Sequence, residues 1–288
     1  MDAQQTVLIA GATGNVGGGA ALALARRGAR VVLIGRNAKK LAARSEAIRA
    51  DLAAPGTGGA KPATLTVDFS DMASVREAAA EALRRFPRID GLVLSVVAWI
   101  ENGPTILPSG HEAMFATNVM GPFLFSQLLL DRIQESNGLV VHVIAPFARR
   151  FHWDDLESIR NHKTGAAYDR TKTYHRMIAG EMARRCAGRV ATLAFDPAFV
   201  IDRSDPTLKQ KWPSGLTGLL WSAMTLFLAK PPEVAGEPIA DLFFSEPRAA
   251  LSGTLFKLGK RIEKPDRAMH DVASGQRLWA QLVQMTGL

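Results

Sequence analysis

Cysteine is almost absent from this chain. Cys186 is the single cysteine among 288 residues, which excludes an intrachain disulfide, and no CxxC pair or Cys/His cluster offers the ligands of a structural metal site. The first residues also lack the basic segment and the long apolar core of a secretory signal peptide. We therefore expect no bound metal, a reducing compartment and a cytoplasmic location.

Long apolar runs are scarce as well. The longest nearly uncharged segment, Trp212 to Ala229, is interrupted by Pro213 and contains several hydroxyl side chains. Its apolar part, Gly215 to Ala229, is shorter than the roughly 18 to 20 residues that span a bilayer. It predicts a helix under a substrate pocket or at a subunit interface, with shallow membrane association as the alternative. No membrane span is expected.

Basic residues are not gathered in one tract. The 35 Lys and Arg residues exceed the 27 Asp and Glu residues, for a net charge of +8, which alone is compatible with nucleic-acid binding. They occur, however, as scattered doublets such as Arg26-Arg27 and Arg184-Arg185, several of them where predicted helices end and where the helix dipole favours cations. We predict no nucleic-acid partner, although the overall field favours an anionic ligand.

Strand-like and helix-like segments alternate along the chain. The apolar runs are continuous rather than alternating, which indicates strands buried on both faces and therefore a parallel sheet covered by helices. The βαβ order predicts an α/β fold with a doubly wound parallel β-sheet and helices on both faces. The predicted strands are 6–10, 30–35, 63–69, 92–97, 139–144 and 190–195, and the helices include 38–54, 112–131 and 167–186.

No linker divides the chain. Residues 1–288 are therefore predicted to form one domain, with residues 197–230 as a mobile substrate-binding excursion and residues 270–288 as a C-terminal tail helix.

A glycine-rich turn follows the first predicted strand. Glycines allow a tight turn and let backbone N–H groups approach a pyrophosphate, which the positive end of the next helix also attracts. Between a strand and a helix, this turn predicts a dinucleotide site and a single-domain Rossmann fold. A turn without a ligand is the alternative. The predicted contacts are Gly11, Thr13, Gly14, Asn15, Val16 and Gly17.

The end of the second strand carries Gly35-Arg36, where an NAD site would have an acidic residue for the ribose 2′-hydroxyl. Arginine pairs with a 2′-phosphate, so NADP(H) is preferred over NAD(H). A surface arginine is the alternative. Asp68 and Phe69 close the third strand and are predicted to meet the adenine, Asp68 as an acceptor for its amino group and Phe69 as a lining ring.

Tyr168 and Lys172 are four residues apart, on one face of a predicted helix. A nearby ammonium stabilises a phenolate and lowers the pKa of the tyrosine, so Tyr168 is predicted to donate a proton to a carbonyl oxygen as hydride arrives. The YxxxK spacing occurs often by chance. It gains weight here because it follows a fifth strand in a chain with a dinucleotide turn.

With these features the sequence resembles the short-chain dehydrogenase/reductase family, and within it the retinol-dehydrogenase-like branch. The resemblance covers nearly the whole chain. Besides the glycine turn and the Tyr168-Lys172 pair, it includes Asp68, residues 110–124 with Asn118, residues 196–200 and the tail 277–280.

The resemblance implies an NAD(P)-dependent oxidoreductase with a proton relay. Asn118 would hold a water that links Lys172 to solvent, and Lys172 would also bind the nicotinamide ribose. The segment from Pro197 to Val200 would contact the nicotinamide amide, and Ser95 belongs to the segment under the cofactor. Helices over 112–131 and 167–186 form the usual dimer surface of the family, which implies a homodimer or homotetramer.

Three positions depart from the family pattern. Asn15 replaces the middle glycine of the turn, a spacing that other branches share, and Leu94 to Val97 stands where the family has Asn-Asn-Ala-Gly. Most seriously, Ala145 stands where the family has a serine that binds the substrate oxygen, and no Ser, Thr or Tyr occurs from Asn137 to Glu157.

The loss of one positioned donor to a developing oxyanion costs roughly 10²- to 10³-fold in rate. Catalysis remains feasible if Tyr168 still donates a proton to the carbonyl oxygen of the substrate. The substrate, water or one of four side chains could replace the hydroxyl: Ser95, Thr164, His142 or His152.

The leading hypothesis is an NADPH-dependent reductase that acts on a carbonyl, or an activated alkene, of an apolar small molecule. The apolar segment Leu216 to Leu228, with Trp212 and Trp221, suits a lipophilic substrate. The missing serine motivates a second hypothesis, an NADP(H)-binding sensor or scaffold with little redox turnover. A third keeps the fold and uses Tyr168 for non-redox acid/base work such as cyclisation, isomerisation or elimination.

Overall fold

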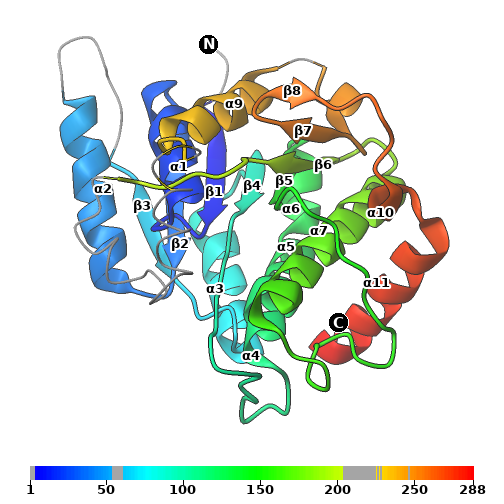
Figure 1. Ribbon diagram of the computed structural model, residues 1–288. Coiled ribbons are helices and arrows are strands. Elements are labelled where there is room, and N and C mark those ends of the chain that lie inside the picture. Colours follow the sequence, from blue (N-terminus) through cyan, green and yellow to red (C-terminus); the bar gives the residue numbers. More distant parts are fainter. Residues whose placement is uncertain (1–3, 54–60, 204–224, 226, 228, 246) are drawn as a thin grey trace.

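The computed structural model describes residues 4–53, 61–203, 225, 227, 229–245 and 247–288. Figure 1 shows one twisted sheet at the centre of the molecule with helices packed on both of its faces. The predicted α/β architecture, a single Rossmann-like domain with a doubly wound sheet, is confirmed.

The sheet has the strand order β3-β2-β1-β4-β5-β6-β7-β8. All neighbouring strands are parallel except the last pair, β7 and β8, which is antiparallel. The order reverses between β1 and β4, and in such sheets ligands bind beyond the carboxyl ends of the strands at this reversal. The strands are β1 (Thr6–Ala10), β2 (Arg30–Gly35), β3 (Ala63–Thr66), β4 (Gly91–Leu94), β5 (Leu139–Val143), β6 (Ala191–Asp196), β7 (Leu255–Lys257) and β8 (Lys260–Arg261).

Two apolar clusters fill the space between the sheet and its helices. One joins alternate residues of the central strands to α1 (Asn15–Arg26), α2 (Ala38–Leu52) and α9 (Glu233–Phe244). The other lies on the opposite face under α3 (Met72–Arg85), α5 (Gly121–Leu128), α7 (Thr164–Cys186) and α11 (Val272–Thr286). Burial on both faces explains why the strands are continuously apolar. The short helices are α4 (Ala113–Phe115), α6 (Leu130–Glu135), α10 (Arg267–His270) and a 3₁₀ turn, Arg248–Leu251.

The predicted helix over 112–131 forms over almost its whole length but changes type within it. A π-helical turn, Ala116–Met120, separates α4 from α5, and α6 begins at Leu130. The turn contains Asn118, whose side chain forms hydrogen bonds with the backbone of the segment after β4. Most of the predicted excursion 197–230, including Trp212, Trp221 and almost all of its apolar run, lies outside the described residues.

Candidate active site

Tyr168 and Lys172 lie on α7 with their side chains one turn apart, at the carboxyl edge of the sheet. Lys172 is 1% exposed, and its ammonium donates to the carbonyl oxygens of Val96 and Val143, each 3.4 Å away. Val143 is the last residue of β5 and Val96 lies two residues beyond the end of β4, so the two central strands fix the lysine. Its Nζ atom lies 5.6 Å from the centre of the Tyr168 ring.

Burial shifts the pKa values of both side chains. It lowers the pKa of Lys172 to about 8. Burial, with a smaller effect from the Asp169 carboxylate, raises the pKa of Tyr168 to about 12. The pKa of Tyr168 is therefore raised and not lowered as predicted, because burial disfavours the charged phenolate. At neutral pH the pair is a neutral phenol beside an ammonium.

Trp99 is a neighbour of Tyr168 that the sequence did not reveal. Its ring centre lies 5.3 Å from that of Tyr168, with the planes tilted by 57°. Trp99 follows the segment that departs from the family's Asn-Asn-Ala-Gly, and it is 49% exposed. The candidate proton donor therefore lies against an aromatic side chain that remains open to a ligand.

Asn118 is fully buried, and its polar atoms contact protein groups. Its side-chain oxygen accepts from the Ala98 N–H at 2.6 Å, and its side-chain nitrogen donates to the Ala98 carbonyl at 2.9 Å. Its own carbonyl lies 2.5 Å from Nε2 of His175. A carbonyl oxygen has two lone pairs, and His175 occupies one of those of Asn118. The second lone pair is available to a water, so the relay water at Asn118 stays a prediction.

The glycine turn is closely packed against the protein backbone at Gly11 and Gly17. Gly11 has φ +84°, and a Cβ there would lie 2.4 Å from the Ser95 carbonyl oxygen. A Cβ on Gly17 would lie 2.5 Å from the Gly11 carbonyl oxygen. The first turn of α1 has no side-chain cap, so its N–H groups are left for an anion. The predicted Ser95 lies directly under the turn, where its N–H donates to Ala10 at 2.9 Å.

The structure brings the turn and the segment after β6 together. The Asn15 side chain donates to the Val200 carbonyl at 3.2 Å. Pro197 is buried, and the N–H of Ala198 donates to Asp196 at 2.8 Å. Asn15, which replaces a family glycine, thus connects two segments that were predicted separately to contact the cofactor.

The predicted adenosine contacts have different surroundings. Arg36 is exposed at the end of β2 and makes no hydrogen bond or ion pair within the described part of the chain. One Asp68 oxygen accepts from the Ser70 N–H and hydroxyl, at 2.9 and 2.7 Å. The prediction that the Phe69 ring lines the adenine is wrong. Its side chain is buried in the core, edge-on to Phe125 with ring centres 5.7 Å apart. Burial of the apolar ring leaves it unavailable to line an adenine.

Comparisons with known proteins identify the family of the chain. Residues 5–151 match the model of the family described as short chain dehydrogenase. Human retinol dehydrogenase 13 is 30% identical over 295 residues, which cover 99% of this chain and 85% of that protein. The chain belongs to the short-chain dehydrogenase/reductase family. Mouse retinol dehydrogenases 13 and 12 also match over 99% of the chain, which indicates the retinol-dehydrogenase-like branch.

This short-chain dehydrogenase has further relatives among bacterial proteins. A daunorubicin C-13 ketoreductase candidate of a Streptomyces species is 34% identical over 202 residues, 69% of this chain and 67% of the relative. The structure of a Shigella flexneri short-chain dehydrogenase determined with NADP has a TM-score of 0.65 at 19% identity and covers 89% of this chain and 97% of that chain. The family and its dehydrogenase and ketoreductase relatives make the protein an NAD(P)-dependent oxidoreductase.

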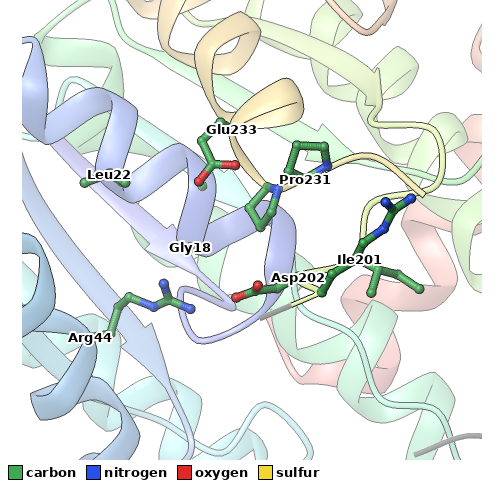
Figure 2. Close-up of a pocket in the computed structure, with 10 residues that line it drawn as sticks. Gly18, Leu22, Arg44, Ile201, Asp202, Pro231 and Glu233 are labelled. Carbon is green, nitrogen blue, oxygen red and sulfur yellow. The ribbon is translucent and has the colours of Figure 1, made fainter. Parts of the chain in front are cut away.

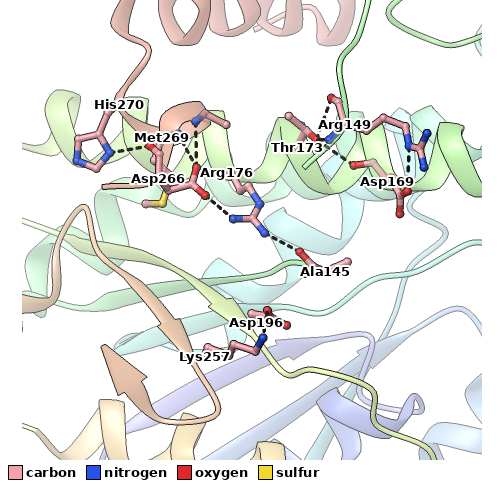
Figure 3. Close-up of polar contacts among 11 residues, drawn as sticks. Ala145, Arg149, Asp169, Thr173, Arg176, Asp196, Lys257, Asp266, Met269 and His270 are labelled. Atoms are coloured by element: carbon pink, nitrogen blue, oxygen red, sulfur yellow. Dashed lines mark hydrogen bonds and ion pairs between the residues drawn. The ribbon is translucent and has the colours of Figure 1, made fainter. Parts of the chain in front are cut away.

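In this short-chain dehydrogenase an ion pair of the buried Arg176 with Asp266 lies beside Ala145, the position where the family pattern led us to expect a serine (Figure 3). Arg176, 4% exposed, donates to the Ala145 carbonyl at 2.6 Å. Its guanidinium also pairs with Asp266 at 2.5 Å. The backbone beside Ala145 is therefore fixed from α7, although no hydroxyl extends from it.

The proposed replacements for the serine are not equally placed. His142 is buried in β5, Ser95 lies under the glycine turn, and His152 is exposed. Thr164 precedes Tyr168 by one turn of α7 and donates to the Ile100 carbonyl at 3.2 Å. Among these four side chains, only Thr164 shares a helix face with Tyr168.

A cavity of about 370 Å³ lies beside α1 in the dehydrogenase (Figure 2). Arg44, Asp202 and Glu233 contribute charged side chains to its wall. Its lining includes none of the predicted catalytic or cofactor-binding residues, so we do not assign it to the active site. Among the described helices, none combines the length and apolarity that crossing a membrane requires.

Proposed function

We propose that this dehydrogenase is an NADPH-dependent reductase that acts on a carbonyl, or an activated alkene, of an apolar small molecule, with Tyr168 as the proton donor. The observation that carries the proposal is the pairing of Tyr168 with the buried Lys172 at the carboxyl edge of the sheet. This edge is also where the glycine turn and the segment after β6 meet.

The residues of the turn fit a dinucleotide, because Gly11 and Gly17 leave no room for a side chain and α1 begins uncapped. A bound nicotinamide supplies the hydride. The turn would hold the pyrophosphate, and Lys172 and the segment Pro197–Val200 would orient the nicotinamide end. Arg36 supports NADP(H) over NAD(H), since its guanidinium is exposed and unpaired within the described residues.

Tyr168 carries the proton that the reaction consumes. Its raised pKa keeps the phenol protonated at neutral pH, and the Lys172 ammonium stabilises the phenolate that remains after transfer. Thr164, one turn before Tyr168, is the side chain we assign as the substitute for the missing serine hydroxyl. Asn118 is assigned to the relay that returns a proton to Lys172.

An apolar substrate is supported by exposed side chains in the segments after β4 and β5. Val97, Trp99 and Phe147 are 53%, 49% and 69% exposed, although exposure of large apolar groups is unfavourable without a ligand. Relatives named for retinol and for daunorubicin ketoreduction support the same substrate class.

The test is NADPH oxidation with a panel of lipophilic ketones, aldehydes and enones, combined with calorimetric titration of NADPH and NADH. We expect turnover by the wild type and its loss in Tyr168→Phe, with NADPH binding retained. Product formation without NADPH consumption would show non-redox acid/base chemistry instead. NADPH binding without turnover, even in Ala145→Ser, would favour the sensor or scaffold.

We further propose a cytoplasmic protein that assembles as a homodimer or homotetramer. The helices expected to form the dimer surface, α5 and α7, pack against α11 of the same chain, where Trp279 lies edge-on to Phe123 with ring centres 5.0 Å apart. Assembly at this surface would therefore include α11. Sedimentation at micromolar concentration tests it, since a single species of 31.0 kDa would contradict the proposal.

A further inference from the structure

Two buried histidines lie behind the candidate active site. His142 in β5 and His175 in α7 are 1% and 2% exposed, and their Nδ1 atoms lie 3.3 Å apart. His175 follows Lys172 by three residues on α7. Its Nε2 atom lies 2.5 Å from the carbonyl oxygen of Asn118. The proposed reaction uses neither imidazole.

The hydrogen bonds of this histidine pair fix its protons. The Asn118 carbonyl can only accept, so Nε2 of His175 carries a hydrogen. Burial lowers the pKa of His142 to about 3 and moves that of His175 well below its ordinary value, so both rings are neutral. A neutral ring has one N–H, so Nδ1 of His175 accepts from Nδ1–H of His142. Nε2 of His142 is then a buried acceptor without a partner among the described residues.

The contacts continue from Asn118 to the segment after β4. The Asn118 amide binds both backbone groups of Ala98, at 2.6 and 2.9 Å, and the next residue is Trp99, whose ring contacts Tyr168. Asn118 is thus held through its carbonyl by His175 and holds Ala98 through its side chain. The π-helical turn at Ala116–Met120 is the local distortion that accompanies this arrangement.

We propose that His175, oriented by His142, is a positioning residue for Tyr168. It holds the Asn118 carbonyl, and through the Asn118 amide and Ala98 it places the Trp99 ring against Tyr168. The structural link stands independently of the reaction, whereas its effect on catalysis rests on the proposed reductase function.

Hydrogen exchange of the Ala98 amide in the full-length protein, without substrate, tests the structural link. His175→Met removes the donor to Asn118 and keeps apolar bulk, so we expect the Ala98 amide to exchange about tenfold faster. His175→Gln carries an amide nitrogen with a reach similar to that of Nε2 and should restore the wild-type rate. The matched control is Tyr174→Phe, which removes a different buried α7 hydrogen bond, the one to the Leu156 carbonyl at 3.0 Å.

The Ala98 amide should exchange at the wild-type rate in Tyr174→Phe. Equal exchange in His175→Met and Tyr174→Phe would overturn the proposal. If His175→Met does not fold, His142→Val takes its place, because it removes the group that orients His175 and replaces it with a residue that suits a buried strand. Faster Ala98 exchange in His142→Val than in Tyr174→Phe is then the expected result, and equal exchange is the contrary one.

Steady-state kinetics test the effect on catalysis. We expect His175→Met to lower kcat about tenfold, because the Trp99 ring beside Tyr168 is misplaced. The KM for NADPH should stay within about twofold of the wild-type value, because the glycine turn and Arg36 are untouched. His175→Gln should recover kcat. An unchanged kcat in His175→Met, or a loss that His175→Gln does not recover, would contradict the positioning role. If the wild type shows no reduction at all, the proposed function fails, and the hydrogen-exchange comparison still decides the structural link.

Discussion

The ammonium nitrogen of Lys172 lies 5.6 Å from the centre of the Tyr168 ring, and two strand-end carbonyls hold it in a buried position. The lysine is thus placed beside the phenol ring and cannot turn freely into solvent. Because the site is desolvated, its charge acts on a phenolate more strongly than it would in water.

The pH dependence of reduction should report Lys172. Its pKa is lowered to about 8, whereas Tyr168, with a pKa raised to about 12, stays protonated over the same range. We expect kcat/KM, which reports groups of the free enzyme, to fall as the pH rises through about 8 and Lys172 loses its charge. Lys172→Arg keeps a cation at alkaline pH and should abolish this alkaline fall of kcat/KM. If kcat/KM still falls near pH 8 in Lys172→Arg, the fall reports the titration of another group.

Cofactor preference should depend on Arg36. We expect Arg36→Ala to weaken NADPH binding by about tenfold or more, because a hydrogen bond to a charged group contributes roughly 1.5 to 3 kcal/mol. NADH lacks the 2′-phosphate and serves as the internal control, so its dissociation constant should stay nearly unchanged. Calorimetric titration measures both. An equal loss for the two cofactors would show that Arg36 does not distinguish them.

The buried ion pair beside Ala145 should contribute to stability. Asp266→Asn removes the charge that pairs with Arg176 at 2.5 Å but keeps an acceptor for the N–H groups of Ala268 and Met269 at the start of α10. An uncompensated buried charge typically costs about 3 kcal/mol in the free energy of unfolding.

Asp271→Asn is the control for Asp266→Asn, since Asp271 also caps a helix, through the Ser274 N–H, but is exposed. We expect a loss below about 1 kcal/mol there. Similar losses in urea unfolding of the two variants would mean that the ion pair contributes little.

Ala198 has a left-handed backbone conformation, with φ +58°. An L-residue with a Cβ atom is strained there by roughly 1 to 2 kcal/mol, so Ala198→Gly should raise the free energy of unfolding by about 1 kcal/mol after the entropy of glycine is allowed for. Ala194→Gly, in the extended strand β6, should lower it. Urea unfolding compares them, and a loss of stability in Ala198→Gly would contradict the expectation.

The local features of the fold could be predicted from the sequence. Continuous apolar runs identify buried strands, and the glycine turn and the Tyr168-Lys172 spacing are both short-range patterns. β7, β8, α3 and α9 were not predicted. The two strands have only three and two residues, and α9 contains Pro238, a residue that normally argues against the interior of a helix.

The remaining parts of the site depend on long-range contacts and on burial. Arg176 meets Ala145, and His175 meets Asn118, across many residues of chain, and Trp99 reaches Tyr168 from a different segment. The Phe69 ring and the Tyr168 pKa were predicted wrongly for the same reason. Residue type and spacing do not show how deeply a side chain is buried.

The central claim is that hydride passes to the substrate while Tyr168 supplies the proton. Its most direct test is product analysis by mass spectrometry after reaction of a lipophilic ketone with NADPH deuterated at C4 of the nicotinamide. We expect one deuterium on the former carbonyl carbon with the wild type and with Tyr174→Phe, and a rate lower by roughly 10²- to 10⁴-fold with Tyr168→Phe. A product without deuterium, or a Tyr168→Phe rate equal to that of the wild type, would contradict the account.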